Sequence, residues 1–264
     1  MSLAIVIPPY ADVIHREEAK EHLKIESATT ADDELIDTQI AIARNTIETA
    51  SGANRRRSNR MLATTYDLKL DYFPNSDHIW LPRGPLISVT SITYVDANGT
   101  TQTMTSTDYV ADLANSKIDL AYSEVWPTTR PDYNAVTVRF VAGMAATFTA
   151  ATTDICTFQG RSFTVGDRVR LLNSGGALPA GLSALTDYFV ITDDKLALTS
   201  GGSAVDITGT GTGTHYVTLN FDDFESMRHA IKLELGRLYF HRGDDDPGYD
   251  VTQRAIDSLV ASSM

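Results

Sequence analysis

The sequence predicts an α+β fold: a helical-bundle core with long N-terminal and C-terminal helices, a small antiparallel β-sheet, and an inserted all-β domain. Three observations predict this class. Helical periodicity is confined to the first 50 residues and to those after 220, whereas residues 61–143 alternate apolar and polar side chains between turn signals. Residues 146–219 carry ten of the chain's 17 glycines, which is typical of short strands joined by tight turns.

The change in composition near residue 146 also predicts the domain boundaries. No glutamate occurs between Glu124 and Glu225, and the helical pattern returns only after residue 219. We therefore expect a discontinuous core domain formed by 1–145 and 220–264. Residues 146–219 are expected to form a β-rich domain inserted into it, because such insertions are tolerated where chain ends lie close together.

Two helices are predicted in the first 50 residues. The first is a short helix over residues 10–25, which contain both polar side chains, such as Glu17 and Lys20, and apolar ones, such as Ile14 and Leu23. The second spans about 32–50, and it begins with three acidic residues, the sign of charge that a helix N-terminus favours. Apolar side chains recur along this second helix at steps of three and four residues: Leu35, Ile36, Ile40, Ala43 and Ile47.

Two more helices are predicted after the inserted domain. The longer one covers about 222–241, with Met227, Ile231 and Leu235 on one face. A short helix is expected over 250–260, after an acidic break that contains proline and glycine.

Strands are expected throughout 61–143. Residues 65–71 and 135–143 alternate cleanly with a period of two. The strand over 88–95 departs from strict alternation at Val89 and Ile92, which indicates a β-bulge. Its Asp-Ala-Asn-Gly end predicts a hairpin turn.

Short strands are also predicted in the inserted domain, and a Thr-Gly repeat over 208–214 separates the last two. This repeat does not fit a phosphate-binding loop, because a strand rather than a helix follows it and it has no lysine. The expected strands are 164–172, 188–191, 195–198, 205–208 and 215–219.

Charge and composition exclude several classes of protein. The 264 residues carry a net charge of −12, which argues against a protein that wraps nucleic acid over its whole surface. No uninterrupted apolar stretch approaches the ~20 residues of a membrane-spanning helix, so we expect no membrane contact. The single cysteine, Cys156, allows no intramolecular disulfide.

No catalytic motif, metal site or cofactor site is predicted, and we expect that the protein is not an enzyme. His229 and His241 lie twelve residues apart, too far to share a metal ion on one helix. Cys156 is expected to be a small buried residue. Trp80 and Trp126 are expected to pack against the core, with an exposed interface anchor as the alternative for each.

Four arginines between residues 55 and 60 form the only basic cluster of this acidic chain: Arg55, Arg56, Arg57 and Arg60. Two interpretations stay open. The cluster is either a solvated loop that offsets nearby negative charge, or a docking patch for an acidic protein partner or for DNA phosphates.

The order of four segments resembles the head–tail connector (adaptor) proteins of long-tailed bacteriophages and of related gene-transfer particles. Together with the closing helix, these segments cover the whole predicted core domain. The arginine-rich loop and the inserted domain both depart from the family's usual pattern. The segments are residues 17–25 with the acidic-start helix that follows, 79–99, 126–143 and 231–242.

The resemblance implies a structural adaptor, assembled in the host cytoplasm and located at the head–tail neck of the virion. Such an adaptor forms a homo-oligomeric ring of about twelve copies, which docks on the portal protein and links it to the next neck or tail completion protein. DNA passes through its lumen without sequence-specific binding. In relatives, the C-terminal segment reaches into the portal. The corresponding segment of this chain is residues 250–264.

The residues expected at the portal or ring interface come from this segment and from the basic cluster. They are Arg55, Arg56, Arg57, Arg60, Asp250, Val251, Arg254, Ile256 and Leu259.

The alternative is a virion binding or decoration protein whose inserted β module recognises a host or virion partner, such as a glycan. A glycan site needs exposed aromatic side chains, for which the module offers Tyr188, Phe189 and Tyr216.

Overall fold

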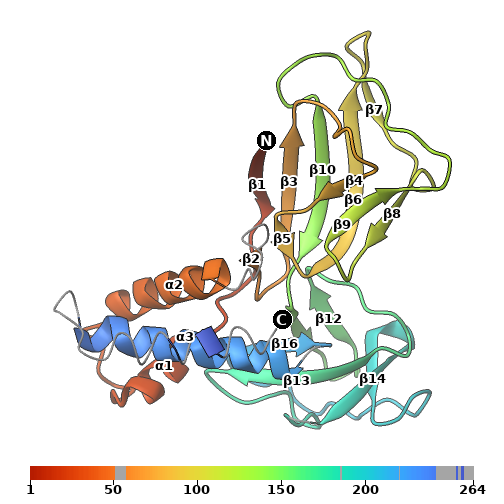
Figure 1. Ribbon diagram of the computed structural model, residues 1–264. Coiled ribbons are helices and arrows are strands. Elements are labelled where there is room, and N and C mark those ends of the chain that lie inside the picture. The colour runs from red at the N-terminus through yellow and green to blue at the C-terminus, as the bar shows by residue number, and fades with distance from the viewer. Residues whose placement is uncertain (51–57, 185, 220, 242–253, 255–256, 259–264) are drawn as a thin grey trace. The chain divides into compact units, whose positions relative to one another are not determined.

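The computed structural model describes residues 1–50, 58–184, 186–219, 221–241, 254, 257 and 258 (Figure 1). These residues belong to two compact units. The first unit comprises Met1–Pro9 and Arg56–Gly143, and the second comprises Tyr10–Arg55 and Met144–Met264.

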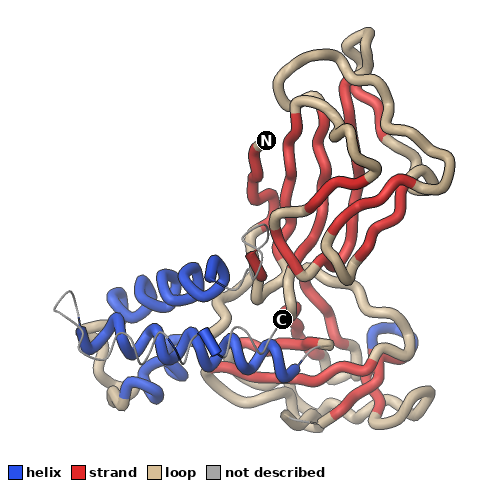
Figure 2. Tube along the Cα trace, viewed as in Figure 1, coloured by secondary structure: helices blue, strands red, loops and turns tan. Residues whose placement is uncertain are grey.

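A five-stranded antiparallel sheet forms most of the first unit (Figures 1 and 2). β1 and β7 lie at its two edges, and β10 lies at its centre. In spatial order, the strands are β1 (Ser2–Ile7), β3 (Thr64–Leu70), β10 (Val136–Ala142), β6 (Leu86–Val95) and β7 (Thr101–Thr103).

The alternating pattern of β10 positions the core of this unit. Val136, Val138 and Phe140 are buried, and the residues between them are half-buried, as a strand with one covered face requires. Phe140 stacks on Tyr66 of β3, with 5.4 Å between the ring centres. Such aromatic pairs stabilise a sheet beyond the area that they bury.

A second, three-stranded layer covers this core. It consists of β4 (His78–Trp80), β9 (Lys117–Leu120) and β8 (Tyr109–Asp112), and its Ile79 and Ile118 are buried in the core. A short parallel pair, β2 (Ser58–Asn59) and β5 (Arg83–Gly84), completes the unit.

The predicted bulge and hairpin of the 88–95 strand are both confirmed. The pairing of β10 with β6 shifts between Arg139, opposite Ser91, and Phe140, opposite Val89, so that one extra residue of β6 is accommodated. The Asp96 carboxylate accepts hydrogen bonds from two backbone N–H groups of the turn that leads to β7. Gly99 adopts a φ of 85°, which explains the glycine at this position.

Three α-helices lie in the described part of the second unit: α1 (Arg16–Leu23), α2 (Asp33–Ala50) and α3 (Phe221–His241). The helix predicted over 10–25 is shorter than expected: it begins at Arg16, after His15, whose side chain caps it, and it ends where Lys24 takes a left-handed conformation. Of the apolar face predicted for 32–50, Ile36, Ile40, Ala43 and Ile47 are buried, whereas Leu35 is half-buried. The short helix predicted over 250–260 lies largely outside the described residues.

The second unit also contains a six-stranded antiparallel sheet and a short 3-10 helix, η1 (Thr192–Asp194). Strands were predicted near β13, β14, β15 and β16, whereas residues 205–208 form no strand. β11 (Ala145–Ala150) and β12 (Cys156–Gln159) were not among the predicted strands; alanine and threonine dominate β11 and leave it without a clear alternation. In spatial order the strands are β12 (Cys156–Gln159), β11 (Ala145–Ala150), β16 (Thr214–Thr218), β13 (Arg168–Ser174), β14 (Asp187–Ile191) and β15 (Lys195–Ala197).

The expected helical-bundle core is not supported. The fold is mixed α+β, but strands outnumber helices among the described residues (Figure 2). The physical reason is that two apolar clusters are built from strand and loop side chains, one in each unit. The three helices form a smaller layer, in which both α1 and α2 contact α3. That residues 146–219 are an insertion into a core domain stays a prediction.

The Thr-Gly repeat of residues 208–214 has a structural explanation. Its glycines pass close to the backbone of the segment after β13, and a Cβ on Gly213 would lie 2.4 Å from the carbonyl oxygen of Ser174. Gly213 also has a φ of 83°, in the left-handed region that favours glycine. The repeat therefore allows close backbone packing.

We predict that Gly213→Ala lowers the free energy of unfolding by about 2 kcal/mol or more, because it adds both a clash and an unfavourable φ. Chemical denaturation measures the change. Thr208→Ala, at an exposed position of the same repeat, is the control and should stay within about 0.5 kcal/mol of the parent. Equal stabilities of the two variants would contradict this explanation of the repeat.

Candidate interface sites

Most of the predicted interface residues lie outside the described residues: Arg55, Arg56, Arg57, Asp250, Val251, Ile256 and Leu259. Arg254 is described and exposed. Arg60 is described in the first unit, where its backbone N–H donates to the Gly84 carbonyl (2.7 Å) and its guanidinium lies 5.9 Å from the centre of the Tyr66 ring. Arg60 thus belongs to the packing of the first unit as well as to the basic cluster.

A loop of the first unit exposes large side chains that the sequence analysis did not select. This loop, residues 121–134, is called the aromatic loop below. Tyr122 is 99% exposed, Tyr133 is 87% exposed, and Val125 is also exposed. Exposed aromatic side chains are enriched where proteins bind one another.

Specific contacts hold the aromatic loop in place. Trp126 stacks on Phe73 with 4.9 Å between the ring centres, and its indole N–H donates to the Ser76 carbonyl (2.8 Å). At the other end, the Asn134 backbone N–H donates to the Asp71 carboxylate (2.9 Å). The core packing predicted for Trp126 is thus confirmed. Trp80 is 43% exposed, so its predicted packing in the core is wrong.

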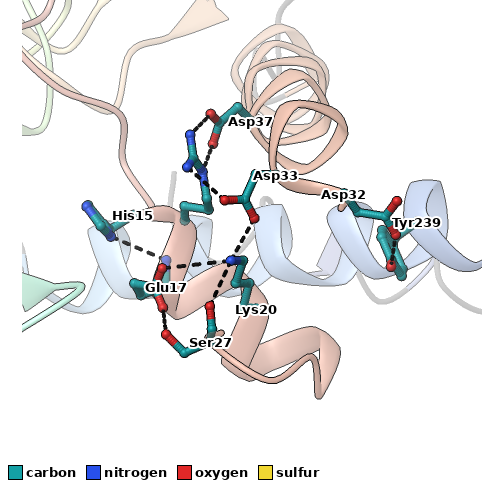
Figure 3. A network of polar contacts seen from close by, with 9 residues as sticks. His15, Glu17, Lys20, Ser27, Asp32, Asp33, Asp37 and Tyr239 are labelled. Carbon is teal, nitrogen blue, oxygen red and sulfur yellow. Dashed lines mark hydrogen bonds and ion pairs between the residues drawn. The ribbon is translucent and has the colours of Figure 1, made fainter. Parts of the chain in front are cut away.

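An ion-pair network joins α1 to α2 in the second unit (Figure 3). Arg16 makes a forked contact with the Asp37 carboxylate and lies 3.1 Å from Asp33. The side chain of Lys20 is buried, and its Nζ contacts Asp33 (2.6 Å) and the Ser27 carbonyl (3.2 Å). The hydrogen bond from Arg16 is the main cause that lowers the pKa of Asp37. The network thus links the two helices across the turn between them.

A second polar cluster joins α1 and α3 to the six-stranded sheet. Glu18 of α1 contacts Arg228 (2.6 Å) and Lys232 (2.5 Å) of α3, and it accepts a hydrogen bond from the Ser174 hydroxyl of β13. The side chain of Arg228 is only 3% exposed. We call these four residues the Glu18 cluster.

The electrostatics of the Glu18 cluster favour the ionised carboxylate. Burial by itself raises the pKa of Glu18, but Arg228, Lys232 and the Ser174 hydroxyl together lower it below its usual value. A buried charge is tolerated when its partners supply both opposite charge and hydrogen bonds. The cluster therefore favours the ionised form of Glu18 in the folded state.

Tyr216 of β16 strengthens the same junction. Its ring is fully buried, and its hydroxyl donates to the backbone carbonyl of Asp12, just before α1. Arg228 lies 5.9 Å from the centre of this ring and donates from Nε to the Val13 carbonyl (3.3 Å). The β-strands of the second unit and its helices therefore share one packed interior.

The described residues offer little for catalysis. They contain no group of histidine, cysteine and acidic side chains that fits a metal ion. Burial raises the pKa of the Cys156 thiol to about 12, far from that of a nucleophilic cysteine. Among the described helices, none is long and apolar enough to cross a membrane.

The aromatic side chains expected to form a glycan site are mostly inaccessible. Tyr188 and Tyr216 are both buried. A shallow hollow of about 410 Å³ in the second unit is instead lined by uncharged groups, among them Tyr10, Gln159 and His215. Both ring nitrogens of His215 are already in contact with protein oxygens.

Chains of similar fold occur in solved structures of gene transfer agent particles. No protein-family model matches the chain, and no curated protein does. A chain in the virion of a native gene transfer agent particle aligns with 99% of this chain and 94% of its own length, at a TM-score of 0.56 and 14% identity.

Two chains from the necks of such particles are similar as well. One comes from the neck of an empty particle computed with C6 symmetry, with a TM-score of 0.53, 15% identity, and coverage of 100% of this chain and 95% of that one. The other comes from the neck of a native particle computed with C12 symmetry, with a TM-score of 0.53, 14% identity, and coverage of 100% and 94%. At this identity, the likeness is one of fold.

We predict that Glu18→Gln lowers the free energy of unfolding by about 2 kcal/mol at pH 7, because the buried Arg228 keeps Glu225 but loses Glu18 as a carboxylate partner. The folded-state pKa of Glu18 is lowered, so its contribution is present above the unfolded pKa and is lost as the pH falls through the folded pKa. The difference between parent and variant should therefore shrink below about pH 4.

Denaturant unfolding at several pH values measures this difference. Glu26→Gln, at an exposed glutamate just after α1, is the matched control and should change stability little. A Glu18→Gln variant as stable as the control at pH 7 would show that the cluster contributes nothing net.

Proposed function

We propose that the protein is a structural component of the neck of a tailed bacteriophage or gene-transfer particle. The observation that carries the proposal is the likeness of its fold to virion and neck chains over nearly the full length of both partners. The chemistry of the described residues agrees with a role without turnover, since their polar clusters are used for packing.

We further propose that the protein forms a ring around the DNA path. Two of the similar chains come from necks computed with C6 and C12 symmetry, which supports an oligomer of this kind. A contact between two different surfaces of one chain closes into a ring when the rotation allows it. The net charge of −12 suits a lumen through which DNA slides without binding to a particular sequence.

The finer proposal is an adaptor that docks on the portal protein and presents its other face to the next neck protein. The basic cluster at residues 55–60 and the segment 250–264 are the candidate contacts. The aromatic loop is a further candidate, because its exposed tyrosines are held at fixed positions by Trp126 and Asn134.

Native mass spectrometry of the protein, alone and mixed with a portal ring, tests the function. We expect either a ring of about a dozen copies or a shift to one when the portal is present. A monomer that ignores the portal would contradict the proposal. Binding of that monomer to immobilised saccharides would favour the alternative, a module that recognises a partner on the host. The uncharged hollow beside Tyr10 would then be the candidate site.

We predict that changing Arg55, Arg56 and Arg57 together to glutamate weakens assembly on the portal by about tenfold or more, because an attractive patch becomes a repulsive one. The melting temperature should change little. Light scattering of the mixture and a thermal melt of the variant measure the two effects.

The control carries the same change in net charge elsewhere in the chain: Lys24→Glu, Lys69→Glu and Lys195→Glu. Equal weakening by both triple variants would show that only total charge matters. A sharp loss of thermal stability in the arginine variant alone would mean that the cluster is structural.

A further inference from the structure

The outer side of β1 is an open sheet edge. β1 pairs with β3 on one side, and within the part of the chain that the structure describes no strand pairs with its other side (Figure 1). Alternate residues of β1 present their backbone N–H and C=O groups along this free side. Such an edge is a template for another extended segment.

The side chains of β1 do nothing to protect this edge. Soluble proteins cover or charge their edge strands, often with lysine, to prevent unwanted pairing. The first charged residue of this chain is Asp12, and Ile5 (56% exposed), Val6 and Ile7 are all exposed on β1. An uncharged, apolar edge in a protein of net charge −12 indicates a surface that is covered in the assembled state.

Leu3 and Ile5 connect the free edge of β1 to the core of the first unit. Leu3 and Ile5 lie opposite Leu68 and Tyr66 of β3, both of which are buried in the core of the first unit. Leu3 packs against this core, whereas the side chain of Ile5 is exposed to solvent. The pairing of β1 with β3 shifts register between Ile5 and Ile7, so a segment laid along β1 would continue the hydrogen-bond ladder and the apolar layer most regularly over residues 2–5.

We propose that β1 is the surface on which a second copy of this chain docks, through the opposite edge of the same sheet. This inference rests on the proposed ring and names its contact. β7 forms that opposite edge, and its Thr101, Gln102 and Thr103 are exposed and uncharged. Threonine also favours extended backbone, so β7 is suited to pairing.

The geometry of the sheet makes this contact repeatable. A β1–β1 contact is isologous and stops at a dimer, whereas β1 of one copy on β7 of the next is heterologous and can continue around a ring. Neighbouring strands in this sheet are all antiparallel, so the first and the fifth strand run in the same direction. Pairing of β1 with β7 between copies with aligned strands is therefore parallel.

Cysteine cross-linking tests the contact on the full chain. The single native cysteine, Cys156, is buried and does not interfere. Ala4, Ile5 and Val6 are each changed to cysteine in combination with Gln102→Cys, so that different registers are sampled. We expect at least one double variant to form a ladder of disulfide-linked oligomers under mild oxidation, and each single variant to stay unlinked.

Two results would overturn the proposal. A dimer from a single β1 variant, such as Ile5→Cys alone, would show β1–β1 pairing. A ring that forms by native mass spectrometry but gives no ladder with any pair would place the contact elsewhere and leave the proposed function intact. If no ring forms even with a portal, the proposed function fails together with this inference.

A charge placed on the edge provides an independent test. Ile5→Lys should weaken ring formation by more than about tenfold, because it charges the edge and removes apolar contact area. Ile42→Lys, at an equally apolar and exposed position on α2, is the matched control and should assemble like the parent. A normal ring from Ile5→Lys and from a second variant, Val6→Lys, would contradict the proposal.

Discussion

The packing of the second unit depends on positive charge that compensates a buried carboxylate. Glu18 finds it in Arg228 and Lys232 of α3, and Ser174 adds a hydrogen bond from the sheet. Glu18 and its two basic partners are largely removed from water. A charge left in this position without an opposite charge would therefore destabilise the folded state. The packing of the helices on β13 and β16 therefore depends on this cluster, and the buried hydroxyl of Tyr216 adds to it.

The two units are stabilised by different kinds of contact. The first unit relies on an apolar core between strands, with aromatic pairs such as Tyr66–Phe140. The second combines an apolar cluster with charge pairs that specify one arrangement of helices and strands. Asp67 in the first unit and Glu18 in the second both have lowered pKa values, and each contacts a basic partner.

The sequence predicted the elements whose patterns are local. The apolar face around Ile40, the bulge near Val89 and the turn at Gly99 were found because spacing and turn chemistry determine them. The helical-bundle core was wrong because the extent of each core depends on non-local packing that periodicity does not reveal. β1 was not predicted because residues 3–7 are all apolar, so its sequence shows no alternation of apolar and polar side chains. The Glu18 cluster brings together Glu18 and Ser174, which lie 156 positions apart in the sequence, and no local sequence motif predicts such a contact.

The central claim is that the helices and the six-stranded sheet of the second unit form one cooperative structure joined at the Glu18 cluster. Hydrogen exchange of the backbone amides, resolved by segment, tests this claim most directly. We expect amides in α1, α3 and β16 to open with the same free energy, and to lose protection together in Glu18→Gln. A sheet that keeps its protection while the helices exchange independently would contradict the claim, and would show instead that residues 146–219 fold as a separate module.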